Sequence, residues 1–94
     1  MAKIKGKTKT GFSFVIDEDI RDDMELLDNL IEMSKGNNAV VPDILISLLG
    51  EDQKKKLYEH CRNEKTGRVS SKKVFAEIEN IFDEAKTKTE DTKN

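Results

Sequence analysis

Hydrophobic positions alternate with polar ones near the N-terminus. Phe12, Phe14 and Ile16 lie on one face at a period of two, with a weaker alternation over residues 3–8. This pattern predicts a short β-hairpin with its turn near residues 8–11. Because two isolated strands are only marginally stable in water, we expect the hairpin to pack on helices or to pair with another chain.

Beyond the hairpin, apolar residues recur every three or four positions, which is typical of amphipathic helices. Gly36 and Gly50 interrupt the pattern, and Pro42 suits the first turn of a helix because its missing N–H has no partner there. Ser70, just before the last apolar run, suits an N-cap. Four helices are therefore expected, over about residues 17–35, 41–49, 51–62 and 70–85.

Two of these expected helices have a clearly defined apolar face. In the first, the face is formed by Ile20, Met24, Leu27 and Ile31, and Leu30 and Ser34 complete it. In the last, it is formed by Val74, Phe75, Ile78, Ile81, Phe82 and Ala85. The run at 44–49 is apolar almost all round, which predicts that the second helix is the most buried.

Length and composition indicate one small domain. The chain has 94 residues, of which 35% are hydrophobic and 38% are charged, so a modest core lies under a heavily charged surface. The fold class that follows is mainly α: a short N-terminal β-hairpin packed on about four helices, with residues 1–86 forming a single α-rich domain. Residues 87–94 are polar and rich in Thr and Lys, which predicts a flexible, disordered C-terminal tail.

Nothing in the sequence calls for an oxidising compartment or a membrane. Cys61 is the single cysteine, so no disulfide can form within the chain. No apolar run approaches the ~18 residues that span a bilayer, and residues 1–10 lack the apolar stretch of a signal peptide. We therefore expect a cytoplasmic protein with no membrane partner.

No group of residues indicates catalysis or a bound cofactor. The acidic run that begins at Asp17 fails the pattern of a calcium loop, since Arg21 occupies a ligand position and Asp22 the position that needs glycine. His60 and Cys61 are too few for a zinc site, and as neighbours on a helix they point in different directions. The expectation is a non-enzymatic protein without metal or cofactor, in which Cys61 is buried and His60 exposed.

Charge is sorted along the chain, although the net charge is only −2. Residues 17–32 hold eight carboxylates and one base, whereas residues 54–73 hold eight bases and two acids. This separation suits a protein that docks on other proteins, and the opposite segments could also meet between copies in a homo-oligomer.

Two candidate partner-binding surfaces follow from the charge and the apolar pattern. One is an acidic surface formed by Asp22, Asp23 and Glu25. The other is the apolar face of the last helix, formed by Val74, Phe75, Ile78 and Phe82. For each, an ordinary structural role is the alternative: a solvated surface for the acids, and the core for the apolar side chains.

Five segments occur in an order that resembles a known family. They are GFSF at 11–14, IDED at 16–19, DDMELL at 22–27, LLGEDQK at 48–54 and GRV at 67–69. Over about residues 8–85, the chain resembles the small tail assembly chaperones of long-tailed bacteriophages and prophages, especially those of Gram-positive hosts. The segments DDMELL and LLGEDQK carry most of this likeness.

The resemblance implies a mostly helical protein that acts in the cytoplasm of the bacterial host. Such chaperones keep the tape measure protein soluble, help to recruit the major tail protein, are absent from the mature virion, and often have an extended form made by ribosomal frameshifting. The family has no catalytic residues to transfer to this chain.

Two other functions stay open. One is a small DNA-binding regulator that uses the basic segment 54–73, and the other is a structural head–tail connector. The acidic net charge and the few aromatic side chains argue against nucleic acid as the partner.

Overall fold

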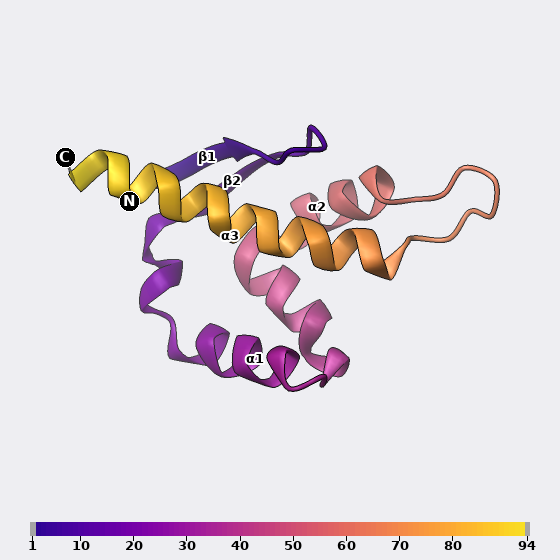
Figure 1. The fold of residues 1–94 in the computed structure, drawn as a ribbon, viewed down its shortest axis with the longest axis horizontal. Helices are drawn as coiled ribbons and strands as arrows, with labels where there is room; N and C mark the ends of the chain where they lie inside the picture. The colour runs from indigo at the N-terminus through magenta and orange to yellow at the C-terminus, as the bar shows by residue number, and fades with distance from the viewer. Residues whose placement is uncertain (1, 94) are drawn as a thin grey trace.

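The computed structural model describes the backbone of residues 2–93 and the side chains of residues 2–86. An antiparallel hairpin is followed by helices, in a molecule of 45 × 27 × 19 Å (Figure 1). The elements in chain order are β1 (Lys3–Lys7), β2 (Ser13–Asp17), the 3-10 helix η1 (Glu18–Asp22), α1 (Met24–Ser34), the 3-10 helix η2 (Asn38–Val40), α2 (Val41–His60) and α3 (Ser71–Lys93). The mainly α fold with an N-terminal hairpin is confirmed.

The hairpin lies on the helices with one face buried, as its alternation predicts. Ile4 pairs with Ile16 and Gly6 with Phe14 across the two strands, and Phe14 and Ile16 are each only 2% exposed. A Cβ atom on Gly6 would lie 2.5 Å from the ring of Phe14, so the close packing of that ring depends on the glycine. β1 packs on α3 and β2 packs on α2, which supplies the support that two strands need.

The first expected helix is divided into two elements. Residues 18–22 form η1, and α1 begins only at Met24 because Asp23 has an extended backbone, with φ −114° and ψ 105°. The Asp23 carboxylate accepts a hydrogen bond from the N–H of Leu26 at 3.1 Å, which makes Asp23 the N-cap. Gly36, with φ 95°, follows the end of α1 as expected.

The four expected helices are not confirmed, because the second and third form one element, α2. Gly50, with φ 78° and ψ 168°, bends α2 sharply between its two halves. The side chain of Gln53 donates to the carbonyl of Leu49 at 2.8 Å and so satisfies an acceptor that the bend frees. The same amide accepts from Val15 N–H at 2.7 Å and donates to Val15 C=O at 2.6 Å, which ties the bend to the edge of β2.

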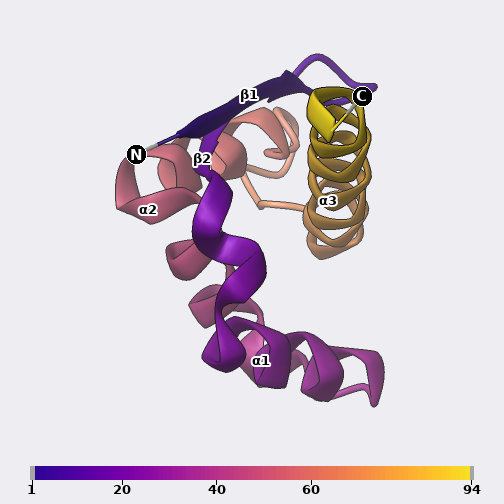
Figure 2. The same cartoon turned by 90° about the vertical axis from the view of Figure 1, so that its left-hand side faces the viewer.

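Only part of the apolar face expected for the first helix is packed, namely Ile20 of η1, which is 9% exposed, and Leu30 of α1. Leu26 is 2% exposed, and Leu30 and Met33 are half-buried against the core. Met24, Leu27 and Ile31, expected on the apolar packing face, are instead exposed by 63%, 48% and 42%. Figures 1 and 2 both place α1 at the far end of the molecule from the hairpin, with α2 between them.

α3 begins after Ser70, whose hydroxyl accepts from the N–H of Lys73 at 3.3 Å, as expected for an N-cap. The helix continues to Lys93 and so includes residues 87–93, for which a flexible tail was expected. The side chains of residues 87–94 lie outside those described, and the flexibility of this segment stays a prediction. Among residues 2–93, none of the helices combines the length and apolar character needed to cross a bilayer.

Candidate functional site

Three apolar side chains on one side of α1 are exposed and do not belong to the core that the described residues form. We call Met24, Leu27 and Ile31 the α1 face; their spacing of three and four residues places them on neighbouring turns of the same side. The opposite side of α1 already packs on α2 through Leu26. Exposed apolar side chains that cluster in this way, rather than singly, are typical of a protein-binding surface.

Carboxylates lie along one edge of the α1 face. At 3.6 residues per turn, Asp28, Glu32 and Glu25 lie roughly 40–100° round the helix from Met24. We call these three residues the acidic border. Glu32 forms an ion pair with Lys35 at 3.7 Å, and this exposed pair neutralises only part of the border. The surface is therefore apolar at its centre and negative along one side.

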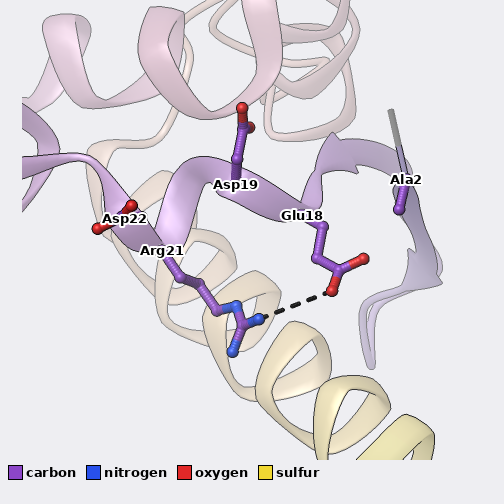
Figure 3. A pocket seen from close by; sticks show the side chains of 5 residues that line it. All are labelled: Ala2, Glu18, Asp19, Arg21 and Asp22. Carbon is purple, nitrogen blue, oxygen red and sulfur yellow. Dashed lines mark ion pairs between the residues drawn. The ribbon is translucent and has the colours of Figure 1, made fainter.

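The acidic candidate residues have different roles in the structure. Asp23 is the N-cap of α1, whereas Asp22 and Glu25 are exposed. Asp22 lines a wide hollow of about 500 Å³ together with residues of η1, including Asp19 and an Arg21–Glu18 ion pair of 3.9 Å (Figure 3).

The hollow beside η1 does not gather its acids around one point. In Figure 3, Asp19 and Asp22 extend in different directions from η1. No group of three or more His, Cys, Asp or Glu side chains among the residues described is placed to hold a metal ion. The hollow is therefore a solvated acidic surface continuous with the start of α1.

The apolar candidates on α3 lie mostly inside the molecule. Val74 is 4% and Ile78 is 1% exposed, so both are core residues. Their position fits the ordinary structural role that was the alternative to partner binding. Phe75 and Phe82 are half-buried and pack against the same core. Phe75 also lines a separate hollow of about 430 Å³ between α2 and the start of α3.

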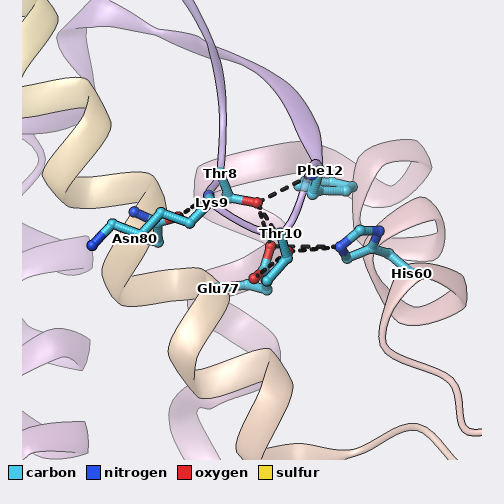
Figure 4. A network of polar contacts seen from close by, with 7 residues as sticks. All are labelled: Thr8, Lys9, Thr10, Phe12, His60, Glu77 and Asn80. Carbon is cyan, nitrogen blue, oxygen red and sulfur yellow. Dashed lines mark hydrogen bonds and ion pairs between the residues drawn. The ribbon is translucent and has the colours of Figure 1, made fainter.

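One buried carboxylate, Glu77, was not singled out from the sequence. Its side chain is 5% exposed and accepts hydrogen bonds from the hydroxyls of Thr8 and Thr10, each at 2.8 Å (Figure 4). Thr8 in turn accepts from Phe12 N–H at 3.1 Å, and Asn80 accepts from Lys9 N–H at 2.6 Å. These contacts fasten the hairpin turn to α3. The available sequence signal was a charged residue at the edge of the apolar face of α3, three residues after Val74 and four before Ile81.

The cluster at Glu77 does not have the geometry of a nucleophile with its base. His60 Nε2 lies 2.8 Å from Thr10 Oγ1 and 4.0 Å from a Glu77 oxygen. In a catalytic triad the carboxylate would instead orient the other ring nitrogen of the histidine. The single hydroxyl proton of Thr10 is donated to Glu77 at 2.8 Å, so Thr10 is not held as a nucleophile with His60 as its base.

Cys61 borders this cluster but is 1% exposed. Burial raises the pKa of its thiol, the charge of Glu77 raises it further, and Lys73 opposes the shift. The thiol is therefore protonated at neutral pH, and only the thiolate is a good nucleophile. The cluster joins three segments of the fold, whereas the α1 face is exposed.

Comparison of the chain with protein-family models, with curated proteins and with solved structures finds no match. The candidate site thus rests on two features of the molecule. These are the exposed apolar α1 face and the acidic border beside it.

Proposed function

We propose that this chain is a non-enzymatic tail assembly chaperone of a long-tailed phage or prophage. In this proposal it binds the tape measure protein, the major tail protein or both in the cytoplasm of the bacterial host and is absent from the mature virion. The resemblance over residues 8–85 supports the family. The observation that carries the binding function is the exposed α1 face, with Met24, Leu27 and Ile31 between 42% and 63% exposed.

The physical requirements of a chaperone fit this surface. A chaperone must offer an apolar face to its client while its charged shell keeps the complex soluble. An amphipathic client helix could place its own apolar residues on Leu27 and Ile31, in the manner of helix-mediated recognition. Basic residues on that helix would meet the acidic border and favour the correct orientation.

A co-expression pull-down with the tape measure and major tail proteins tests the proposal. Leu27→Ser should weaken client binding about fivefold, since burying the exposed half of a leucine contributes on the order of 1 kcal/mol. Val15→Ser is the matched control, because Val15 is 40% exposed but lies on the hairpin. Equal loss from both variants, or loss from neither, would contradict a docking role for α1.

The charge on the acidic border is tested separately. Glu25→Lys/Asp28→Lys reverses two exposed carboxylates and leaves the Asp23 cap intact, so α1 should still form. We expect weaker retention of the client and a smaller dependence of binding on salt. Glu79→Lys, an exposed change on α3, should behave as the wild type.

Failure of the folded wild-type protein to retain either client would overturn the proposal. Two further measurements then decide between the alternatives. Salt-dependent binding to duplex DNA would favour the regulator. Detection of the protein in purified virions would favour the head–tail connector.

A further inference from the structure

The two edges of the hairpin have different surroundings. On the β2 edge, the side chain of Gln53 accepts from Val15 N–H at 2.7 Å and donates to Val15 C=O at 2.6 Å. The backbone groups of Val15 therefore point away from β1, and α2 already supplies their partner. The other edge of this two-stranded sheet is formed by β1.

The strand pairing fixes which backbone groups of β1 point outward. In an antiparallel pair, opposite residues alternate between pairs that exchange hydrogen bonds and pairs whose N–H and C=O groups point away from the partner strand. Val15 lies opposite Lys5, so the N–H and C=O of Lys5 also point away from β2. Lys3 and Lys7 follow at the same period of two. We call this outward row of backbone groups, at residues 3–7, the β1 edge.

Hydrogen bonds at both ends of the hairpin agree with this assignment. Thr8 N–H donates to Phe12 C=O at 2.9 Å, and Glu18 N–H donates to Ala2 C=O at 3.1 Å. Thr8 and Ala2 are each separated from Lys5 by an odd number of positions, which places them in the set that bonds across the hairpin. The backbone groups of Lys5 therefore belong to the set that points outward.

α3 covers this side of the hairpin only at the turn. There, Lys9 N–H donates to Asn80 of α3 at 2.6 Å. Among the residues that the structure describes, no hydrogen bond from outside the hairpin reaches the backbone of residues 3–7. Figure 2 shows β1 running away from α3 towards the N-terminus, and Figures 1 and 2 both place β1 above β2 at the top of the molecule. The β1 edge is therefore open to a further strand.

The side chains along the β1 edge are basic. Lys3, Lys5 and Lys7 are exposed, whereas Ile4 between them is buried. At a period of two, the three lysines project from one face of the strand, roughly 7 Å apart. Lys3 forms an ion pair with Asp17, while Lys5 and Lys7 form none with the residues described. Two of the three charges are thus available to a partner.

A second copy of the same edge is a poor partner for these lysines. If two β1 strands paired with each other, lysines would lie close to lysines across the new ladder, and like charges in such positions destabilise a sheet. Edge lysines protect against self-pairing in this way. Carboxylates at the same positions would turn the repulsion into attraction. The charge of the edge therefore favours an acidic strand.

We propose that the β1 edge binds an extended acidic segment of another protein as a third strand of the sheet. The segment would exchange main-chain hydrogen bonds with Lys3, Lys5 and Lys7, and its carboxylates, at every second position, would lie beside the lysine side chains. In such strand addition the main-chain bonds supply affinity and the alternate side chains supply specificity. A third strand would also stabilise a sheet that has only two.

The inference does not rest on the proposed function, and it uses a different surface. The hairpin and α1 lie at opposite ends of the molecule (Figures 1 and 2). Leu27→Ser should therefore bind an acidic strand as the wild type does. Failure to bind such a strand would leave the chaperone proposal standing.

Nuclear magnetic resonance of the isotope-labelled protein with synthetic peptides tests the inference. The probe is a capped peptide of alternating glutamate and valine, about seven residues long, which is close to the length of a typical strand. The control peptide has the same composition, with its glutamates in one block and its valines in another. The alternating peptide should shift the amide signals of residues 3–7 and bind about tenfold more tightly than the control.

Hydrogen exchange separates strand addition from simple attraction between charges. Lys5 N–H points to solvent in the free protein, so it should exchange quickly. Saturating peptide should slow this exchange about tenfold or more, since the N–H becomes hydrogen-bonded. Ile4 N–H is the internal control, because it belongs to the set that bonds to Ile16 and is protected with or without the peptide.

Two variants of Lys5 separate the side-chain charge from the backbone. Lys5→Ala removes the charge and keeps the N–H, whereas Lys5→Pro removes both, at a position whose N–H the pairing with β2 does not use. Both should bind the peptide more weakly than the wild type does, and Lys5→Pro about tenfold more weakly than Lys5→Ala. Thermal unfolding followed by circular dichroism shows whether each variant is folded, and the exchange measurement on the wild type needs no variant.

Reversal of charge tests the lysines themselves. Lys5→Glu/Lys7→Glu should weaken peptide binding about tenfold or more, since two attractions become repulsions. Lys65→Glu/Arg68→Glu is the matched control, because these two exposed bases lie in the loop before α3, far from β1 (Figure 1). The control variant should bind the peptide as the wild type does.

Three results would overturn the inference. The first is a folded wild-type protein that does not bind the alternating peptide at millimolar concentration, which would leave the lysines with edge protection as their role. The second is equal binding of the two peptides, or unchanged exchange of Lys5 N–H at saturation, which would mean attraction between charges without strand pairing. The third is exchange of Lys5 N–H that slows as the protein concentration rises without peptide, which would mean that β1 pairs with a second copy.

Discussion

Removing the Glu77 carboxylate should weaken the whole fold, because this buried side chain accepts hydrogen bonds from the hairpin turn. Glu77→Ala leaves Thr8 and Thr10 without the acceptor that each contacts at 2.8 Å. The two threonines lie in the hairpin turn, 69 and 67 residues away along the chain. The substitution therefore removes the hydrogen bonds from the hairpin turn to Glu77 of α3 without removing any apolar core side chain.

The magnitude follows from burial. A hydrogen bond to a charged group contributes roughly 1.5–3 kcal/mol. Removing the acceptor destabilises the fold more when the donor is buried than when it is exposed to water. Thr8 is 4% exposed, whereas Thr10 is exposed, so its hydroxyl can donate to water once Glu77 is removed. Most of the loss therefore comes from Thr8, and we expect the free energy of unfolding to fall by about 2–4 kcal/mol. This is a large part of the ~5–15 kcal/mol of a typical domain.

Urea unfolding followed by far-ultraviolet circular dichroism measures this loss. With a slope of about 1–2 kcal/mol per M, the midpoint should fall by roughly 1–4 M at an unchanged slope. Glu79→Ala is the matched control, because Glu79 is an exposed carboxylate two residues further along α3; its effect should stay within about 0.5 kcal/mol.

A double-mutant cycle assigns the effect to the contact itself. Thr8→Val and Glu77→Ala should show a coupling energy of about 1 kcal/mol or more, whereas Thr8→Val and Glu79→Ala should be additive. Equal effects of Glu77→Ala and Glu79→Ala would refute the reasoning, since Glu77 would then contribute nothing through its threonine contacts.

Two further predictions concern the bend in α2 and the buried thiol. Gly50→Ala should destabilise the protein by about 1–3 kcal/mol, because φ 78° and ψ 168° are accessible almost only to glycine. If residue 50 were part of a straight helix, the same change would stabilise the protein by about 1 kcal/mol. A fall in the urea midpoint therefore supports the bend, and a rise contradicts it. Cys61 should react with a thiol-specific disulfide reagent at neutral pH at least ~100-fold more slowly in the folded protein than in urea, since burial hides the thiol and raises its pKa. Equal labelling rates would contradict its burial.

The hairpin and the chain breaks were predictable from the sequence because they depend on local geometry. Alternate side chains of a strand point to opposite faces, so the period at Phe12, Phe14 and Ile16 identifies the buried face wherever the hairpin packs. Gly36 and Gly50 adopt positive φ values of 95° and 78°; Gly36 follows the end of α1, and Gly50 bends α2 without dividing it into two elements. The tolerance of glycine for positive φ is sufficient to predict the two interruptions at Gly36 and Gly50.

The face of α1 that packs was not predictable, because the helix has two apolar sides. Met24, Leu27 and Ile31 have helical spacing, but so do Leu26, Leu30 and Met33. Periodicity gives the same support to either set. The Asp23 cap fixes where α1 begins, and contact with α2 selects the side of Leu26.

What the sequence determined by itself is the hairpin, the helical segments and the separation of acidic from basic residues, since these depend on neighbouring positions in the chain. The tertiary structure alone decided that Leu27 is exposed, that Val74 and Ile78 are core, and that Glu77 joins α3 to Thr8. These outcomes depend on contacts between residues far apart in the chain. Burial and charge pairing at such contacts are properties of the packed molecule, and no local period encodes them.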